Sequence, residues 1–234
     1  MRTDGRAGHE LRSWKIEPGY ISNSLGAALV TSGKTRVICT ANAESRAPAW
    51  LERGGWVTAE YAMLPGATAP RGRRDPGGRG KEIQRLIGRS LRAAVELDAL
   101  VGVDGPVSII CDCDVIEADG GTRTASITGA YVALMLALRG LVARGVLERV
   151  PPCTPVAAVS VGVVAGAVML DLTYEEDSRA DVDLNAVLRE GQGYVELQGT
   201  GERDTFSRAQ LGAMLDLADA GCRQLFAMQA EALS

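Results

Sequence analysis

Two adjacent glycines followed by a threonine and an arginine are the residues most suited to chemistry in this chain. Gly120 and Gly121 follow a strand-like segment, and an apolar helix is expected to begin at about Thr122. Free backbone N–H groups at a helix start attract anions. Gly121 lets an anion approach the backbone, Thr122 adds a hydroxyl, and Arg123 offers a two-pronged phosphate donor. The residues alone leave two interpretations open, a phosphate site and an ordinary capped helix start.

A second candidate is a group of carboxylates later in the chain. Asp181 and Asp183 share one face if their segment is a strand, and Asp177 lies in the loop before it. Carboxylates near a phosphate repel it unless a proton or a divalent cation lies among them, and oxygen ligands suit Mg²⁺ or Mn²⁺. The alternative is a solvated acidic turn. Asp112 and Asp114 also share one face of a predicted strand, where we expect them to pair with arginines.

Charge and histidine content narrow the possible chemistry. The only histidine is His9, so histidine-based catalytic triads and metal sites are not expected. The net charge is −4, yet the segment from Arg71 to Arg92 carries a local charge of +6. Such a patch steers anions to one place, although a solvated helix face is the alternative. Its basic residues are Arg71, Arg73, Arg74, Arg79, Lys81, Arg85, Arg89 and Arg92.

Hairpins and helices must position these groups. Ala27–Val30 pairs with Arg36–Thr40 in one predicted hairpin, and Val156–Val164 pairs with Ala167–Leu172 in a second. Each hairpin is followed by polar loops and a helix, which suggests a duplicated β–α unit. Strands that alternate with such helices indicate an α/β or α+β domain with helices packed on a sheet.

Three helices are expected from apolar periodicity. The segment 122–144 is apolar almost all round, which predicts a central buried helix. A capping box at Ser207–Gln210 marks the start of the last helix. The glycine-rich segment Gly72–Gly80 is expected to be a mobile loop. The predicted helices are Glu82–Leu100, Thr122–Arg144 and Ser207–Leu233.

The bulk composition fits one cytoplasmic domain of residues 1–234. No apolar run is expected to reach the length of a membrane span, and the charged segment 1–12 does not resemble a secretory signal. The five cysteines are scattered and odd in number, so we expect reduced, mostly buried thiols.

The run Ala118–Ala130, which contains Gly-Gly-Thr-Arg-Thr, resembles the central motif of the ribonuclease PH family. That family consists of phosphate-dependent 3′ exoribonucleases that trim transfer RNA precursors. Further matches follow in order along nearly the whole chain: Arg2–Arg6, Val37–Ala41, Gly55–Tyr61, Glu82–Arg89, Cys111–Val115 and Leu170–Asn185.

The resemblance implies an α+β fold like that of ribosomal protein S5 domain 2, with pseudo-repeated halves at 1–145 and 146–234. It also implies a homohexamer built as a trimer of dimers. Phosphate would be held by Arg79, Gly121, Thr122 and Arg123. Asp177 and Asp183 would be catalytic, as ligands of Mg²⁺ or Mn²⁺ or as an acid. The expected RNA-binding arginines are Arg71, Arg73, Arg74, Arg85 and Arg89.

The implied reaction uses inorganic phosphate to release nucleoside 5′-diphosphates from transfer RNA precursors and other RNA 3′ ends, and it is reversible. The alternatives are a non-catalytic RNA-binding subunit of an exosome-like ring and a metal-dependent hydrolytic nuclease. The sequence departs from the family pattern at Gly66, where an arginine is usual, and at Gly80-Lys81, which replace a Thr-His pair. The loop 75–78 is short, and Val101–Pro106 is a small insertion.

Overall fold

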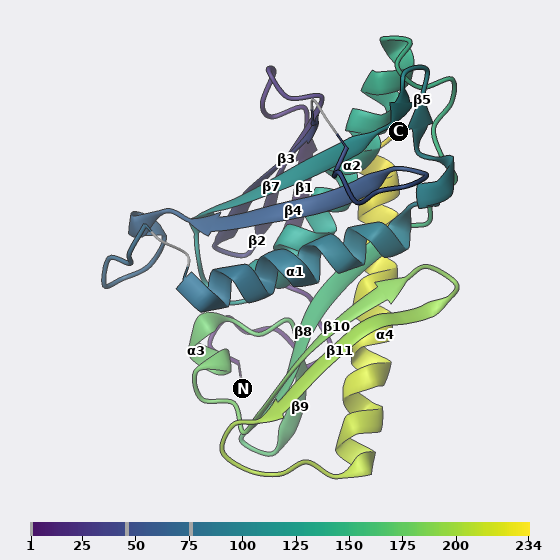
Figure 1. Cartoon of the computed structure of the whole chain (residues 1–234). Coiled ribbons are helices and arrows are strands. Elements are labelled where there is room, and N and C mark those ends of the chain that lie inside the picture. Colours follow the sequence, from purple (N-terminus) through teal and green to yellow (C-terminus); the bar gives the residue numbers. More distant parts are fainter. Residues whose placement is uncertain (1, 45–46, 75–76) are drawn as a thin grey trace.

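The first sheet has five strands and comes from the N-terminal part of the chain (Figure 1). The computed structural model describes residues 2–44, 47–74 and 77–234. The strand order is β1-β2-β3-β7-β4, and only the β4–β7 pair is parallel. Parallel neighbours need a crossover connection, which here contains helix α1. The strands are β1 Trp14–Pro18, β2 Gly26–Ser32, β3 Thr35–Ala43, β4 Trp56–Met63 and β7 Ser108–Glu117.

The second sheet is antiparallel and comes from the C-terminal part, in the order β11-β10-β8-β9. β8 is an almost continuous apolar run and is buried along nearly all its length, because α2 and α4 both contact it. A two-stranded ribbon, β5 with β6, occupies the position of the predicted insertion. These strands are β5 Val101–Gly102, β6 Gly105–Pro106, β8 Val156–Val164, β9 Ala167–Leu170, β10 Val182–Arg189 and β11 Gly193–Gly201.

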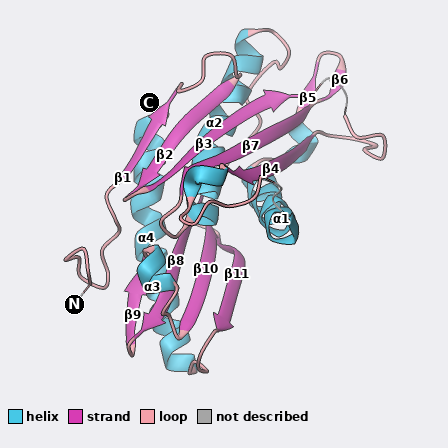
Figure 2. Ribbon diagram, turned by 90° about the vertical axis from the view of Figure 1, so that its left-hand side faces the viewer, coloured by secondary structure: helices cyan, strands magenta, loops and turns pink. Residues whose placement is uncertain are grey.

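Helix α2 lies at the centre of the molecule, between the two sheets (Figure 2). It contacts β2 and β3 of the first sheet and β8 of the second. Helix α4 covers β8 and β9, while α1 packs along β4. The helices are α1 Gly77–Ala94, α2 Thr122–Ala143, α3 Tyr174–Asp177 and α4 Arg208–Ala232, with 3₁₀ turns η1 Pro65–Ala67 and η2 Leu97–Ala99.

Most of the predicted elements are confirmed. Both hairpins form, as β2–β3 and β8–β9, and the chain has the α+β class expected of it. Helix α2 ends one residue before its predicted end, and the Ser207–Gln210 capping box starts α4. The division into duplicated halves stays a prediction.

The boundaries of α1 were predicted wrongly. The helix begins at Gly77, inside the segment predicted to be a loop, and ends at Ala94 instead of Leu100. Its apolar pattern continues beyond Ala94 because Val95 forms a β-bridge with Cys153 and Leu100 is buried beyond a 3₁₀ turn. Apolar periodicity alone does not distinguish residues buried on a helix face from residues buried in a strand or beyond a turn. Residues 75 and 76 of the predicted loop lie outside the described residues.

The expectation about apolar run length was also wrong. Helix α2 is long and apolar enough to span a membrane by length and composition, although 78% of its most apolar window is buried inside the protein. It is apolar all round because sheets cover it on opposite sides. The expected free thiols are confirmed: all five cysteines are unpaired, and four are buried.

Candidate active site

The loop between β7 and α2 has the conformation of an anion site. Gly120 and Gly121 both have positive φ values, 76° and 65°, which glycine adopts without steric cost. A Cβ on Gly120 would lie 2.6 Å from the carbonyl oxygen of Leu172, so the close packing also requires glycine there. Gly121 caps α2, and no side chain caps the helix start. The first N–H groups of α2 therefore lack the capping partner that most helices have.

A buried ion pair supports this loop from behind. The guanidinium of Arg12 donates to Asp171 Oδ1 from Nε (3.1 Å) and Nη2 (2.6 Å), and to the carbonyl of Asp119 from Nη1 (2.6 Å). Trp14 Nε1 donates to the other Asp171 oxygen at 2.9 Å. Burial alone would raise the pKa of Asp171, but Arg12 and Trp14 outweigh it and lower the pKa below its usual value. Thr35 Oγ1 donates to the Gly120 carbonyl at 2.7 Å and completes the support.

The loop forms one wall of a cavity of about 480 Å³. Its lining residues include side chains from the starts of α1 and α2, from α3 and from β10, elements that are labelled in Figure 1. Every residue predicted to hold phosphate or to act as a catalytic acid lines it: Arg79, Gly121, Thr122, Arg123, Asp177 and Asp183.

Neutral and acidic partners orient Arg123. Its Nη1 donates to Gln198 Oε1 at 2.8 Å and lies 3.5 Å from Glu82 Oε1. Gln198 Nε2 in turn donates to Glu82 at 3.2 Å, so the amide holds the cation and the carboxylate in one network. Beside it, the Thr122 hydroxyl lies 2.9 Å from the phenol oxygen of Tyr61.

The two aspartates lie in a setting that disfavours negative charge. Burial raises the pKa of Asp183 to about 6, with a further contribution from the charge of Asp177. Burial also raises the pKa of Asp177, although Arg79 and Arg123 oppose the shift. Asn185 Nδ2 donates to Asp183 Oδ2 at 3.1 Å, whereas Oδ1 is buried and has no partner in the described part of the chain.

The aspartates fit a divalent cation that is only partly held by protein. Mg²⁺ often uses one or two carboxylates and completes its octahedron with water and substrate phosphate oxygens. Two carboxylates and the unpartnered Asp183 oxygen meet that need. Among the described residues, no group of three His, Cys, Asp or Glu side chains is placed to hold a metal ion.

The predicted RNA-binding arginines lie outside the cavity wall. Arg71, Arg73 and Arg74 are exposed on the segment between β4 and α1, and Arg85 is exposed on α1. Arg89 instead forms a two-pronged ion pair with Glu196, at 2.9 and 2.8 Å, so its charge is already paired.

The comparisons with known proteins agree with this geometry. The model of the 3′ exoribonuclease family matches residues 10–139 with its domain 1 and residues 154–221 with its domain 2. The chain belongs to the 3′ exoribonuclease family. Its curated relatives include ribonuclease PH of Corynebacterium glutamicum (strain R), which is 58% identical over 99% of this chain and 96% of that protein. Ribonuclease PH of Bdellovibrio bacteriovorus is 50% identical over 100% of this chain and 96% of that protein.

Solved structures show the same 3′ exoribonuclease fold at lower identity. Rice (Oryza sativa) Rrp46 superimposes with a TM-score of 0.80 at 17% identity, and 99% of each chain is covered. A chain of the Archaeoglobus fulgidus exosome with RNA bound to the active site gives a TM-score of 0.82 at 24% identity, with 96% of this chain and 91% of that chain covered.

One pairing expected of this exoribonuclease-family chain is wrong. Among the described residues, neither Asp112 nor Asp114 pairs with an arginine. Strand alternation turns both away from α2, and Asp112 accepts a long hydrogen bond from Thr40 at 3.5 Å. Burial and the neighbouring Asp114 raise the pKa of Asp112.

The sequence interpretation missed three supporting groups of this family member: the Arg12–Asp171 pair, Gln198 and Asn185. Asn185 was the easiest to find, because it lies two residues after Asp183 on the same face of β10. Gln198 comes from β11, where no local motif marks it.

Proposed function

We propose that this protein is a phosphate-dependent 3′–5′ exoribonuclease that releases nucleoside 5′-diphosphates. The observation that carries the proposal is the shared cavity. Two arginines and an uncapped helix start line the same cavity as two partly buried aspartates. A hydrolytic nuclease has no need for a second anion site, whereas phosphorolysis must hold an attacking phosphate beside a phosphodiester. Membership of the 3′ exoribonuclease family supports the same activity.

Positioning and charge account for most of the proposed catalysis. Arg79, Arg123 and the backbone N–H groups at Thr122 bind inorganic phosphate and offset its charge. An oxygen of this phosphate attacks the terminal phosphodiester phosphorus of RNA. The bond from phosphorus to the 3′ oxygen breaks, the terminal nucleotide leaves as a diphosphate, and the shortened RNA regains a 3′ hydroxyl. The reverse reaction adds nucleotides from nucleoside diphosphates.

Two roles follow for the aspartates, and the pH profile separates them. As ligands, Asp177 and Asp183 would hold Mg²⁺ or Mn²⁺, which supplies positive charge at the reacting phosphorus. As an acid, Asp183 would protonate the leaving 3′ oxygen, since its pKa is raised to about 6. The acid role predicts activity that falls as pH rises above about 6, whereas the ligand role predicts activity that falls as pH decreases below it.

The finer assignments are part of the proposal. The substrates are transfer RNA precursors and other RNA 3′ ends, and the exposed arginines Arg71, Arg73, Arg74 and Arg85 hold the RNA by its phosphates. We assign Arg89 a lesser part, because Glu196 already pairs with it. The active form is a homohexamer in the cytoplasm, built as a trimer of dimers.

A product assay tests the proposal. The protein is incubated with Mg²⁺ and an RNA bearing a 3′ extension, with and without phosphate, and the mononucleotides are identified. Nucleoside diphosphates that form only with phosphate are expected. Monophosphates formed without phosphate would indicate a hydrolase instead. RNA binding without any product would favour the non-catalytic ring subunit.

Arg123→Ala supplies the matching variant, because it removes the two-pronged donor at the start of α2. It should abolish turnover and leave folding and RNA binding nearly unchanged. Arg144→Ala is its control, since Arg144 is an exposed arginine at the other end of the same helix. An active Arg123→Ala protein would refute the role assigned to Arg123.

A further inference from the structure

The cavity has apolar lining residues that phosphate and metal binding do not explain. Unlike the arginines and aspartates, several of its lining residues present aliphatic, thioether or aromatic surface. Phosphate and divalent cations gain nothing from such groups, whereas a nucleobase requires an apolar or aromatic surface to stack on. These residues are Met63, Ala69, Pro70, Ala118 and Tyr174.

Tyr174 is the aromatic member of this set and lies on a well-anchored backbone. It is the first residue of α3, whose capping box joins Thr173 to Glu176. Its own N–H donates to Asp119 Oδ1 at 3.3 Å, which ties α3 to the glycine loop. Glu176 is held in turn by Arg2 through two hydrogen bonds of 2.7 Å. These contacts fix the position from which the ring projects.

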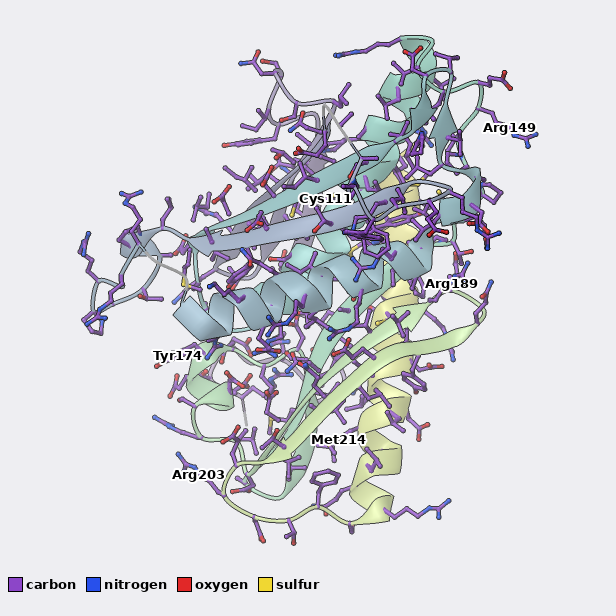
Figure 3. All side chains as sticks on the ribbon, in the orientation of Figure 1. Cys111, Arg149, Tyr174, Arg189, Arg203 and Met214 are labelled. Atoms are coloured by element: carbon purple, nitrogen blue, oxygen red, sulfur yellow. The ribbon has the colours of Figure 1, made fainter. Side chains whose placement is uncertain are left out.

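The ring itself is free. Tyr174 is 64% exposed, and its phenol oxygen has no hydrogen-bond partner within the described residues. Figure 3 places Tyr174 on α3, close to the start of α1, where the cavity lies. Asp177 follows three residues later, so the two side chains are neighbours on the helix surface. The exposed ring of Tyr174 therefore lines the cavity beside Asp177.

We propose that Tyr174 stacks on the base of the 3′-terminal nucleotide of the RNA, the nucleotide that leaves as the diphosphate. This inference rests on the proposed function, because it takes the position of the scissile phosphate from it. Stacking on a tyrosine tolerates every base, since each has a π face. A nuclease that removes nucleotides one after another needs this tolerance.

Binding of RNA without phosphate tests the stacking apart from turnover. Dissociation constants are measured by fluorescence anisotropy for two labelled RNAs, one ordinary and one whose terminal nucleotide lacks its base. Tyr174→Ala should weaken binding of the ordinary RNA by roughly 10-fold to 100-fold, the range seen when one stacking aromatic is removed. It should leave the RNA without the terminal base unaffected, and Tyr174→Phe should bind both RNAs as the wild type does.

The control variant is Tyr20→Ala, because Tyr20 is similarly exposed, at 51%, and does not line the cavity. It should bind both RNAs normally. Equal loss on both RNAs, or no loss on either, would overturn the assignment of Tyr174. If the variants bind the two RNAs as expected but the wild type forms no phosphate-dependent product, the stacking role of Tyr174 stands and the proposed reaction is refuted. Absence of RNA binding by the wild type would refute both.

Discussion

Replacement of Asp171 by asparagine tests how the glycine loop is supported. Asp171 and Arg12 have side-chain exposures of 1% and 3%, so water does not compensate either charge. Asparagine keeps the shape of the side chain and tolerates the positive φ of this residue, 54°, as well as aspartate does. The substitution therefore removes a charge without adding backbone strain, and it leaves the guanidinium of Arg12 buried without its counter-ion.

The expected cost follows from that unpaired cation. Loss of one partner of a buried ion pair destabilises a protein by about 3–5 kcal/mol. For a chain of this size, each kcal/mol lowers the melting temperature by roughly 2–4 °C, so a decrease of roughly 6–20 °C is expected. The KM for phosphate should also rise, because Arg12 bonds the carbonyl of Asp119 directly before the glycine pair.

The assay compares the wild type with the Asp171→Asn variant by thermal denaturation and by steady-state kinetics at varied phosphate. Asp98→Asn is the control, because it removes an exposed partner from the Arg53 pair, whose side chains are 85% and 74% exposed, and should cost less than about 1 kcal/mol. The pKa of Asp171 is lowered in the folded state, so its stabilising contribution is present above the unfolded pKa of about 3.9 and is lost at lower pH. A decrease no larger than that of the control at neutral pH would refute the reasoning.

Three further predictions concern single features. Gln198→Glu adds a carboxylate at the Arg123 guanidinium and should raise the KM for phosphate several-fold with little change in RNA affinity. Steady-state kinetics at varied phosphate measure this, and an unchanged KM would contradict the role of Gln198 in orienting Arg123. Ser207→Ala removes the cap of α4 and should lower the free energy of unfolding by about 1 kcal/mol in urea titration, whereas an unchanged midpoint would argue against the cap. Joint replacement of Arg71, Arg73 and Arg74 by alanine should weaken RNA binding and reduce the dependence of RNA affinity on salt concentration, without changing the KM for phosphate. An unchanged dependence of RNA affinity on salt would show that these arginines do not contact RNA phosphates.

The local parts of the site were predictable because their signals lie close together in sequence. The glycine pair, Thr122 and Arg123 adjoin one another, and the apolar pattern of α2 predicts where its helix begins. Placement of Asp177 and Asp183 in the same cavity required the family resemblance, since sequence spacing did not bring the second sheet to the start of α2.

The supporting contacts were not predictable, because they join segments that are distant in sequence. Arg12 and Asp171 are 159 residues apart, and Arg123 and Gln198 are 75 residues apart. An arginine in a polar N-terminal segment has no pattern that distinguishes it from a solvated residue. Its burial depends on how the two sheets pack around α2, and that packing is a property of the whole fold. The end of α1 was missed for a similar reason, because pairing of Val95 with Cys153 replaces the helix there.

Transfer of labelled phosphate tests the central claim most directly. The protein is incubated with unlabelled RNA, Mg²⁺ and ³²P-labelled inorganic phosphate, and the released nucleotides are separated. If phosphate is the attacking group, the label will appear in the β-phosphate of nucleoside 5′-diphosphates, and Arg123→Ala will release none. Unlabelled nucleoside monophosphates, formed at the same rate without phosphate, would contradict the account.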